Sequence, residues 1–315
     1  MITLKQIYKL AIELGIKNDL RSRKEVEKEL LRVKKQYQKL SSQEKKYFDK
    51  ERLVNPYMDS GIHYDNGKKI KKVLAGIDIA GAELLVAKEL KVDAIIAHHP
   101  LGKGLAYLSD VMRLQADVLS QYGVPINIAE SLMKIRIQEV ARGINAANHF
   151  RIPMAAEKLN INLMNVHTPA DNMVATFLKN KIEKEKPEYI EDILEILNKI
   201  PEYQEASKQG IGPTLFTGNK NNKAGKIAIT EITGGTEGSA KIYQAMAQAG
   251  IGTVISMHQS EEHRKEAEKA HINVIIAGHI SSDSIGMNLF LDEIEKRGVE
   301  IVPISGLIRI SRLKK

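Results

Sequence analysis

Three short apolar runs in this sequence end at a histidine, and they limit the folds that the chain can adopt. The runs span 92–97, 161–166 and 273–277, and His98, His167 and His279 follow them within two residues. Apolar runs of this length, separated by helical segments, are typical of buried parallel strands. Ligands of such sheets gather beyond the carboxyl ends of the strands. The sequence therefore predicts an α/β protein whose strand-end histidines share one crevice.

The most specific signal is the pair His98 and His99, because these two histidines are adjacent and Pro100 ends the strand. Successive side chains of a regular strand point to opposite faces, so both rings reach one crevice only where the backbone turns. That geometry suits two metal ions side by side, with one ring to each ion. The same pair also fits a simpler role as histidines at a sheet edge.

Each of the other two strand-end histidines is followed by an acid four residues later, Asp171 after His167 and Asp283 after His279. On a helix this spacing brings the two side chains within about 5–6 Å at Cβ. Imidazole and carboxylate are usual ligands of zinc, iron and manganese. Both acids also suit the first turn of a helix, where the helix dipole favours negative charge. Helix capping accounts for the acids, but it does not account for the histidines.

With these motifs in view, the sequence resembles the NIF-three-like dinuclear metal proteins, often labelled GTP cyclohydrolase 1 type 2 homologues. The resemblance runs from about residue 55 to the C-terminus, in the family's order. Its motifs are His98-His99-Pro100-Leu101, His167-Thr168-x-x-Asp171, Gly234-Gly235 followed by Gly238-Ser239, and Gly278-His279 with an acid at position 283. The family usually has glutamate at the last position, whereas this chain has the shorter Asp283.

The resemblance implies that His99 and Asp171 hold one metal ion, and that His98 and His279 hold the other. Asp283 would bridge both ions. This ligand set implies two divalent metal ions per chain, and histidine with aspartate accepts zinc, manganese, iron or nickel. The resemblance also implies a homo-oligomer, specifically a hexamer, and a small-molecule substrate such as a nucleotide.

These expectations favour a dinuclear metal-dependent hydrolase, in which a metal-bound hydroxide attacks a nucleotide-like or phosphoester substrate. His167 is the candidate catalytic residue, since a histidine beside the ions can act as a general base or acid near neutral pH. The alternative is a metal-binding interaction or regulatory protein without turnover.

A glycine-rich segment at 233–239 joins a predicted strand to a predicted helix, and its backbone N–H groups are candidates to bind an anion. Turns of this kind are also common without a ligand. The candidate residues are Gly234, Gly235, Gly238 and Ser239. His258 follows another predicted strand and is a further candidate for the crevice. The remaining histidines, expected to be surface or structural residues, are His63, His149, His263 and His271.

Positive charge is concentrated near the N-terminus. Residues 1–72 contain 19 Lys and Arg against 10 Asp and Glu, whereas the remaining residues contain 28 against 29. A basic arm centred on 17–52 can contact nucleic acid or acidic ligand groups. A solvated helical face is the simpler interpretation, because acids are interleaved with the bases and aromatic residues are few.

The sequence contains no cysteine, which excludes disulfide bonds and thiolate metal ligands. It also shows no apolar run of membrane-spanning length and no cleavable leader, so the cytoplasm is the expected compartment.

The predicted organisation is two similar α/β lobes with mostly parallel sheets flanked by helices, a metal crevice between the lobes, and an N-terminal helical extension. The expected boundaries are a basic helical extension at 1–54, docked loosely on the body, a first lobe at 55–178 with a helical insertion at about 130–160, a helical connector at 179–225, and a second lobe at 226–315. We also expect a short strand at 124–128 and a final strand at 299–304 that completes the second lobe.

Overall fold

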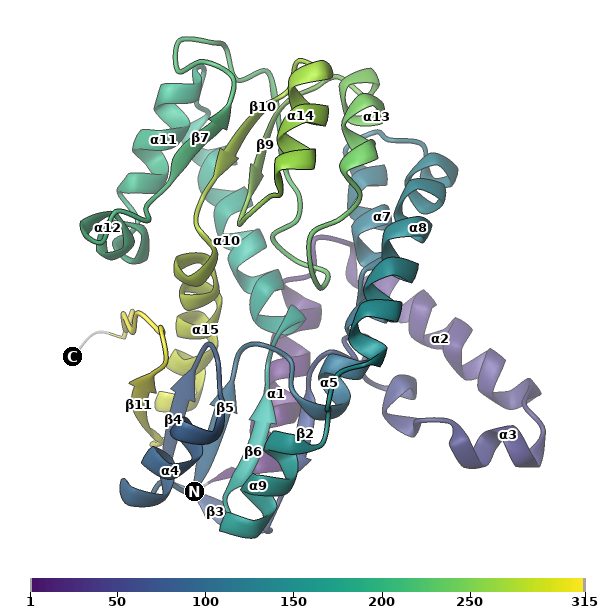
Figure 1. The fold of residues 1–315 in the computed structure, drawn as a ribbon, viewed down its shortest axis with the longest axis vertical. Coiled ribbons are helices and arrows are strands. Elements are labelled where there is room, and N and C mark those ends of the chain that lie inside the picture. Colours follow the sequence, from purple (N-terminus) through teal and green to yellow (C-terminus); the bar gives the residue numbers. More distant parts are fainter. Residues whose placement is uncertain (1, 314–315) are drawn as a thin grey trace.

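The computed structural model describes residues 2–313 and contains two mostly parallel β-sheets, one above the other in Figure 1. The first sheet has the strand order β11-β4-β5-β6-β2, with β2 antiparallel at its edge. Its strands are β2 (Gly61–Tyr64), β4 (Lys72–Gly76), β5 (Ala94–Ala97), β6 (Asn162–Asn165) and β11 (Glu300–Ile304). Every residue of β5 and β6 is buried, as expected for central strands covered on both faces.

The second sheet has the strand order β7-β10-β9-β8, with β7 antiparallel at its edge. Its strands are β7 (Thr214–Thr217), β8 (Lys226–Ile229), β9 (Ile251–Ser256) and β10 (Asn273–Ile276). A separate two-stranded ladder pairs β1 (Ile2–Thr3) with β3 (Lys69–Ile70). Parallel strands joined through helices confirm the predicted α/β class with mostly parallel sheets.

Two long helices join the sheets and cross between them (Figure 1). Helix α10 (Thr168–Glu185) leaves the end of β6, and helix α15 (His279–Glu295) leaves the end of β10 and leads to β11. Their backbones nearly touch, because a Cβ added to Gly286 would lie 2.3 Å from the carbonyl oxygen of Ala170. This crossing sets the distance between the first turns of the two helices.

The remaining helices pack against the two sheets or against other helices. None of the helices within residues 2–313 combines the length and the apolar character that crossing a membrane requires. These helices are α4 (Gly81–Glu89), α5 (Gly102–Ala106), α6 (Leu108–Val111), α7 (Arg113–Gln121), α8 (Ile126–Asn145), α9 (Arg151–Leu159), α11 (Ile190–Asn198), α12 (Pro201–Lys208), α13 (Tyr243–Gln248), α14 (Glu261–Lys269) and the 3-10 turns η1 (Lys50–Leu53) and η2 (Ala240–Ile242).

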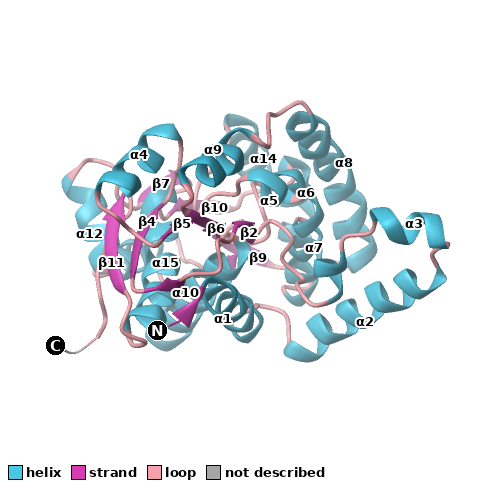
Figure 2. Ribbon diagram, turned by 90° about the horizontal axis from the view of Figure 1, so that it is seen from below, coloured by secondary structure: helices cyan, strands magenta, loops and turns pink. Residues whose placement is uncertain are grey.

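The N-terminal segment is helical, as predicted, but its first helix is not loosely docked. Leu4, Ile7 and Ala11 of α1 (Leu4–Lys17) are buried in the core of the first sheet. Near the end of this helix, a Cβ on Gly15 would lie 2.8 Å from the Cβ of Pro169, so α1 packs directly against the start of α10. By contrast, α2 (Arg23–Lys39) and α3 (Ser42–Tyr47) project from the body (Figures 1 and 2).

The structure corrects the expected role of the final strand. It is present as β11, but it pairs in parallel with β4 of the first sheet and does not complete the second lobe. The segment 226–315 is therefore not one lobe, because α15 carries the chain back to the first sheet. Strand order depends on contacts between distant segments, and a local apolar pattern does not encode them.

The strand expected at 124–128 is also wrong, because α8 begins there at Ile126 after Pro125. Ile126 and Ile128 are exposed, whereas Ala129 and Met133 are buried at helical spacing. Two helices, α8 and α9, fill the region of the expected insertion. The short edge strands β2 and β7 were not predicted, since only one of their eight positions is buried.

The helix crossing gives a first prediction. Gly286→Ala should lower the free energy of unfolding by about 1–3 kcal/mol, because the new methyl group overlaps the backbone of Ala170. Thermal and urea unfolding of the purified variant measure this loss. Gly143→Ala is the matched control: it lies within α8 with no atom near its added Cβ, so it should stabilise by about 0.5–1 kcal/mol. Equal effects of both substitutions would contradict the proposed contact.

Candidate functional site

The first turns of α10 and α15 meet the ends of β5 and β6, and this junction gathers every side chain predicted as a metal ligand. Strand β5 ends just before the adjacent histidines, β6 ends just before His167, and each long helix carries one aspartate near its start. The gathered residues are His98, His99, Asp171, His279 and Asp283, with His167 beside them. The junction lies between the first and the second sheet, at the position predicted for the crevice.

Asp283 lies between three histidine rings. Its Oδ1 is 3.4 Å from Nε2 of His98, and its Oδ2 is 3.4 Å from Nε2 of His99 and 3.5 Å from Nε2 of His279. The two oxygens of this one carboxylate therefore face different rings. A carboxylate in such a position can bridge two cations, one at each oxygen.

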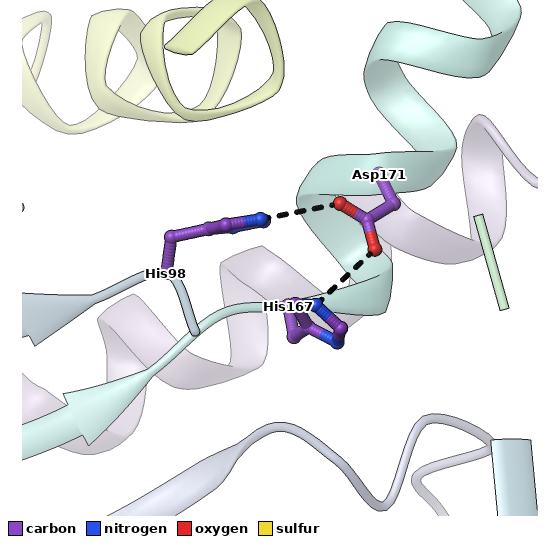
Figure 3. A group of neighbouring side chains, drawn as sticks. All are labelled: His98, His167 and Asp171. Atoms are coloured by element: carbon purple, nitrogen blue, oxygen red, sulfur yellow. Dashed lines mark ion pairs between the residues drawn. The ribbon is translucent and has the colours of Figure 1, made fainter. Parts of the chain in front are cut away.

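Asp171 approaches a different histidine from the one that the family resemblance implies. Its Oδ1 is 3.4 Å from Nε2 of His98 (Figure 3), whereas His99 and His279 share the facing oxygen of Asp283. The distances thus place His98 beside both Asp171 and Asp283, and His99 and His279 beside Asp283, and the implied division of these ligands between two ions stays a prediction. The two adjacent side chains point in different directions at the strand end, so that His98 contacts both long helices and His99 contacts Asp283 on α15.

Three of the histidine rings are oriented by a hydrogen bond from Nδ1–H to an oxygen atom. A neutral ring whose Nδ1–H donates a hydrogen bond presents the lone pair of Nε2 on its other side. Metal-binding histidines are usually oriented by such a bond to a carboxylate or carbonyl oxygen. The three bonds run from His98 to the carbonyl of Val166 (2.9 Å), from His99 to Oδ1 of Asp78 (2.7 Å) and from His167 to Oδ2 of Asp59 (2.7 Å).

The two central carboxylates are buried without full hydrogen bonding. Asp171 is 3% exposed and Asp283 is 1% exposed. Oδ1 of Asp171 and Oδ2 of Asp283 accept no hydrogen bond from any residue that the structure describes. A buried carboxylate without partners is costly unless a cation satisfies it. The donor set therefore fits a site for divalent metal ions.

The electrostatics of the junction agree with this assignment. Burial and the nearby carboxylates of Asp283 and Asp59 raise the pKa of Asp171 well above its usual value. Burial also opposes ionisation of Asp283, but the surrounding histidines, with His98 foremost, outweigh it and lower the pKa of Asp283. Without a bound cation, the ionised form of Asp171 is therefore disfavoured, whereas that of Asp283 is favoured.

The histidines differ in their protonation. Burial disfavours the charged form of His99, but the carboxylates of Asp283 and Asp78 outweigh that effect and raise its pKa to about 9. Burial lowers the pKa of His279 to about 4.

His167 is positioned both to bind a metal ion and to exchange a proton. Its Nε2 lies 3.8 Å from Oδ2 of Asp171 (Figure 3), and the ligand atoms of His98, His167 and Asp171 all lie within 4.8 Å of one another. Burial lowers the pKa of His167, which keeps its ring neutral. A second such group, with the same limit of 4.8 Å, comprises His98, His99 and Asp283.

Three acids that shape this site were not predicted from the sequence. Asp78 follows β4, so its strand-end position was a signal that could have identified it. Asp59 lies in a loop before β2, and no local pattern marks it. Glu231 lies two residues beyond β8 in the left-handed region (φ 56°), which is unusual for a residue other than glycine. Its carboxylate accepts hydrogen bonds from the N–H of Gly238 and from the Gln259 side chain.

The structure accounts for the glycine-rich loop by packing. Gly234 and Gly235 have positive φ angles, and a Cβ on either would lie 3.0 Å from a side chain of α7 or the residue before it. The Gln115 amide donates to the carbonyls of Gly234 and Thr236, and so holds the loop against α7. The N–H of Gly238 is already bonded to Glu231. Anion binding by this loop stays a prediction.

A small cavity of about 20 Å³ lies over the junction, and both halves of the molecule line it. His167, Asp171 and Asp283 form its floor, and Thr233 and His258 lie on the side of the second sheet. The ring of His258 lies 4.6 Å from that of His279, so His258 reaches the crevice as predicted. A cavity of this size has room for a bound water molecule.

These features define a class: an α/β protein of two sheets with a buried histidine–aspartate centre of metal-binding type at their junction. Within that class the chain is similar to proteins of the NIF3 superfamily. A NIF3 superfamily protein from Sphaerobacter thermophilus is 29% identical and superposes with a TM-score of 0.73, over 79% of this chain and 92% of that one.

A second solved structure supports the fold alone. Reduced HcgD from Methanocaldococcus jannaschii is 18% identical, with a TM-score of 0.52 over 83% of this chain and 94% of that chain. No protein-family model matches the sequence, and no curated protein matches it.

A chain of hydrogen bonds connects the sheet edge to the loop that orients His167. Nε2–H of His63 donates to Oδ1 of Asn165 (2.8 Å), and the Asn165 amide donates to the carbonyl of Asp59 (2.7 Å). Burial lowers the pKa of His63 to about 4. His63 is therefore neutral in the folded chain near neutral pH.

This gives a prediction for stability against pH. Because the pKa of His63 is lower in the folded chain than in the unfolded chain, the unfolded chain takes up the proton first as the pH falls below about 6.5. His63 should therefore cost up to about 1.4 kcal/mol of stability per pH unit between about 6.5 and 4. His63→Gln replaces the ring N–H donor with an amide N–H donor that does not titrate. The variant should therefore show a smaller slope of the free energy of unfolding against pH, measured by urea unfolding at a series of pH values. Substitution of the exposed His271 by Asn is the control and should leave the slope unchanged. An unchanged slope in His63→Gln would contradict the prediction.

Proposed function

We propose that the protein is a dinuclear metal-dependent hydrolase that acts on a nucleotide-like or phosphoester substrate. One observation carries the proposal: two buried carboxylate oxygens, on Asp171 and Asp283, face imidazole Nε2 atoms and receive no hydrogen bond within residues 2–313. Two of the three histidines around Asp283, and His167 beside Asp171, have Nδ1 engaged elsewhere, so Nε2 is directed at the carboxylates.

The distances suggest how two ions would share the ligands. His98, Asp171 and Asp283 would hold one ion. His99, His279 and Asp283 would hold the other. Zinc, manganese, iron and nickel all accept imidazole and carboxylate ligands.

The charge of the surrounding carboxylates supports two divalent ions over one. Asp59, Asp171 and Asp283 are buried, and Asp78 contacts His99 at the rim. These carboxylates, together with Glu231 in the lining of the same cavity, would be balanced in part by bound divalent cations and in part by the charge on His99. A single ion would leave part of the charge on Asp171 and Asp283 uncompensated.

Two bound divalent ions lower the pKa of water and polarise the group that it attacks. This chain supplies the surrounding functions: the cavity over the junction has room for a water molecule, and His167 offers a neutral Nε2 that can accept a proton from it. Asp59 fixes the orientation of the His167 ring through Nδ1. His258, at the mouth of the cavity, is exposed enough to contact a substrate.

Hydrolysis of a ring C–N bond in a nucleotide is the first substrate class to test, and phosphoesters are the second. A cavity of about 20 Å³ does not admit a nucleotide unless the 233–239 loop moves. That observation favours a second candidate function, a metal-binding regulatory or interaction protein without turnover.

Metal content per chain tests the proposed centre. Protein purified without chelator should contain about two divalent ions per chain, as measured by inductively coupled plasma mass spectrometry. Asp171→Asn should lose the ion beside His98, and His279→Ala the ion beside His99, so each should retain about one. Asp283→Asn should lose both. His271→Asn, remote from the centre, is the control. Wild-type protein that lacks metal and gains none from added zinc or manganese would exclude the proposal.

Turnover distinguishes the two candidate functions once metal is bound. Metal-loaded wild type should hydrolyse at least one nucleotide or phosphoester, and Asp171→Asn should not. If instead the bound metal raises the melting temperature and no substrate is hydrolysed, the regulatory function is correct.

The carboxylate behind His167 gives a further prediction. Asp59→Asn keeps the size of the side chain but removes the charged acceptor that fixes the His167 ring. Metal affinity should fall by about 10–100-fold, because the loss of the acceptor that orients a metal-binding histidine typically has an effect of this size. Competition with a chromogenic chelator measures the change. Asp65→Asn, on the same segment but outside the centre, is the matched control and should bind metal as wild type does. Equal affinities of the two variants would contradict the role of Asp59.

A further inference from the structure

Helices α2 and α3 form a projecting arm, residues 22–48, and α2 contacts η1 and α1 of the body. Val26 is buried, and Leu30, Val33 and Leu40 are half-buried on the same side of α2. The ring of Tyr37 lies 4.8 Å from that of Phe48 at the far end of the arm. The apolar side of α2 is therefore the side that packs.

The opposite side of α2 carries a continuous row of positive charge. Five cations recur at intervals of three or four residues, so at about 100° per residue they fall within a sector of about 80°, nearly opposite the apolar side. All five are exposed. They are Lys24, Lys28, Arg32, Lys35 and Lys39, and we call them the basic stripe.

The acids of α2 are interleaved with these bases in the sequence, and at 100° per residue Glu25 lies only about 20° beyond the edge of the stripe. Glu25 caps the helix at Ser22, Glu27 pairs with Arg23, and Glu29 pairs with Arg21. No ion pair within the described part of the chain involves the basic stripe. Lysines on other helices differ, because many of them pair with an acid one turn away, as Lys179 does with Glu183.

A buried arginine sets the direction of the arm. Arg21, 5% exposed, forms ion pairs with Asp19 (2.9 Å), Glu29 (2.8 Å) and Asp117 (3.1 Å). The hydroxyl of Tyr57 donates to Asp19 from the body of the protein. Because these contacts join the start of α2 to α7 and to the core, the arm projects in a defined direction (Figure 2).

We propose that the basic stripe binds the phosphate backbone of a nucleic-acid duplex. From Lys24 to Lys39 the stripe is about 22 Å long, with a cation every 5–6 Å or so. Each strand of a duplex carries one charge per about 3.4 Å of its axis, so the five cations of the stripe span the length of about six phosphates of one strand. Contacts of this kind do not depend on base sequence. The proposal is independent of the metal centre.

The same geometry argues against a membrane surface as the partner. A helix that lies on a membrane buries a free apolar face in the lipid. On α2 that face is partly covered by the chain, since Val26 is buried and Leu30 and Val33 are half-buried, and Leu31 is the one large apolar side chain of the helix that is mostly exposed within residues 23–39.

Fluorescence anisotropy with a labelled duplex DNA of about 25 base pairs, several times longer than the stripe, tests the proposal. Five phosphate contacts predict a slope of about −4.5 for log K against log salt, or a loss of roughly 500-fold between about 50 and 200 mM salt. The variant K24Q/K28Q/R32Q/K35Q/K39Q should lose most of this affinity and most of the slope. The control K179Q/K181Q/K199Q/K208Q/K269Q changes the net charge equally at paired lysines and should bind as wild type does.

Helical content and metal content should be unchanged in the stripe variant, because the substituted side chains are exposed. Absence of duplex binding by the wild type at low salt would overturn the proposal. Equal loss of binding in the stripe variant and the control would do the same, because net charge alone would then explain the affinity. Binding to anionic phosphatidylglycerol vesicles, without binding to the duplex, would assign the stripe to a membrane instead.

Discussion

The crossing of α10 and α15 is the contact on which the rest of the site depends. Gly286 lets the two helices approach until their backbones touch at Ala170, and this approach brings their first turns together. Asp171 and Asp283 are thereby buried side by side, each near the positive end of its own helix. A wider crossing would separate the carboxylates, and a narrower one is excluded by the backbone itself. The helix dipoles offset only part of the cost of burying two anions.

Local sequence patterns predicted much of this site. The strand-end positions of His98, His99 and His167 follow from short apolar runs, and the spacing of four residues follows from helices that begin directly after the strands. Such signals are local, since each depends on fewer than ten or so consecutive residues. They identified which side chains meet, and the alternating class of the fold, without any knowledge of strand order.

What the sequence did not predict depends on contacts between distant segments. Asp59 orients His167 from a loop more than a hundred residues earlier, and no periodic pattern marks it. The burial of α1 was not predicted, because the N-terminal region is basic in composition. Leu4, Ile7 and Ala11 nevertheless have the spacing of one helix face. The position of His98 beside both Asp171 and Asp283 required the actual direction of each ring. These features depend on tertiary contacts, which local propensity does not determine.

The return of β11 to the first sheet has a consequence for the order of folding. The pairing of Glu300–Ile304 with Lys72–Gly76 closes a loop of more than two hundred residues, so this edge of the first sheet stays open during most of synthesis. The second sheet, by contrast, is built from strands between 214 and 276 and can form earlier. His279 and Asp283 leave the ribosome only after both sheets have nearly all their strands. The centre can therefore assemble only late in synthesis, and the exposed edge of β4 is the surface most open to mispairing or to chaperones before then.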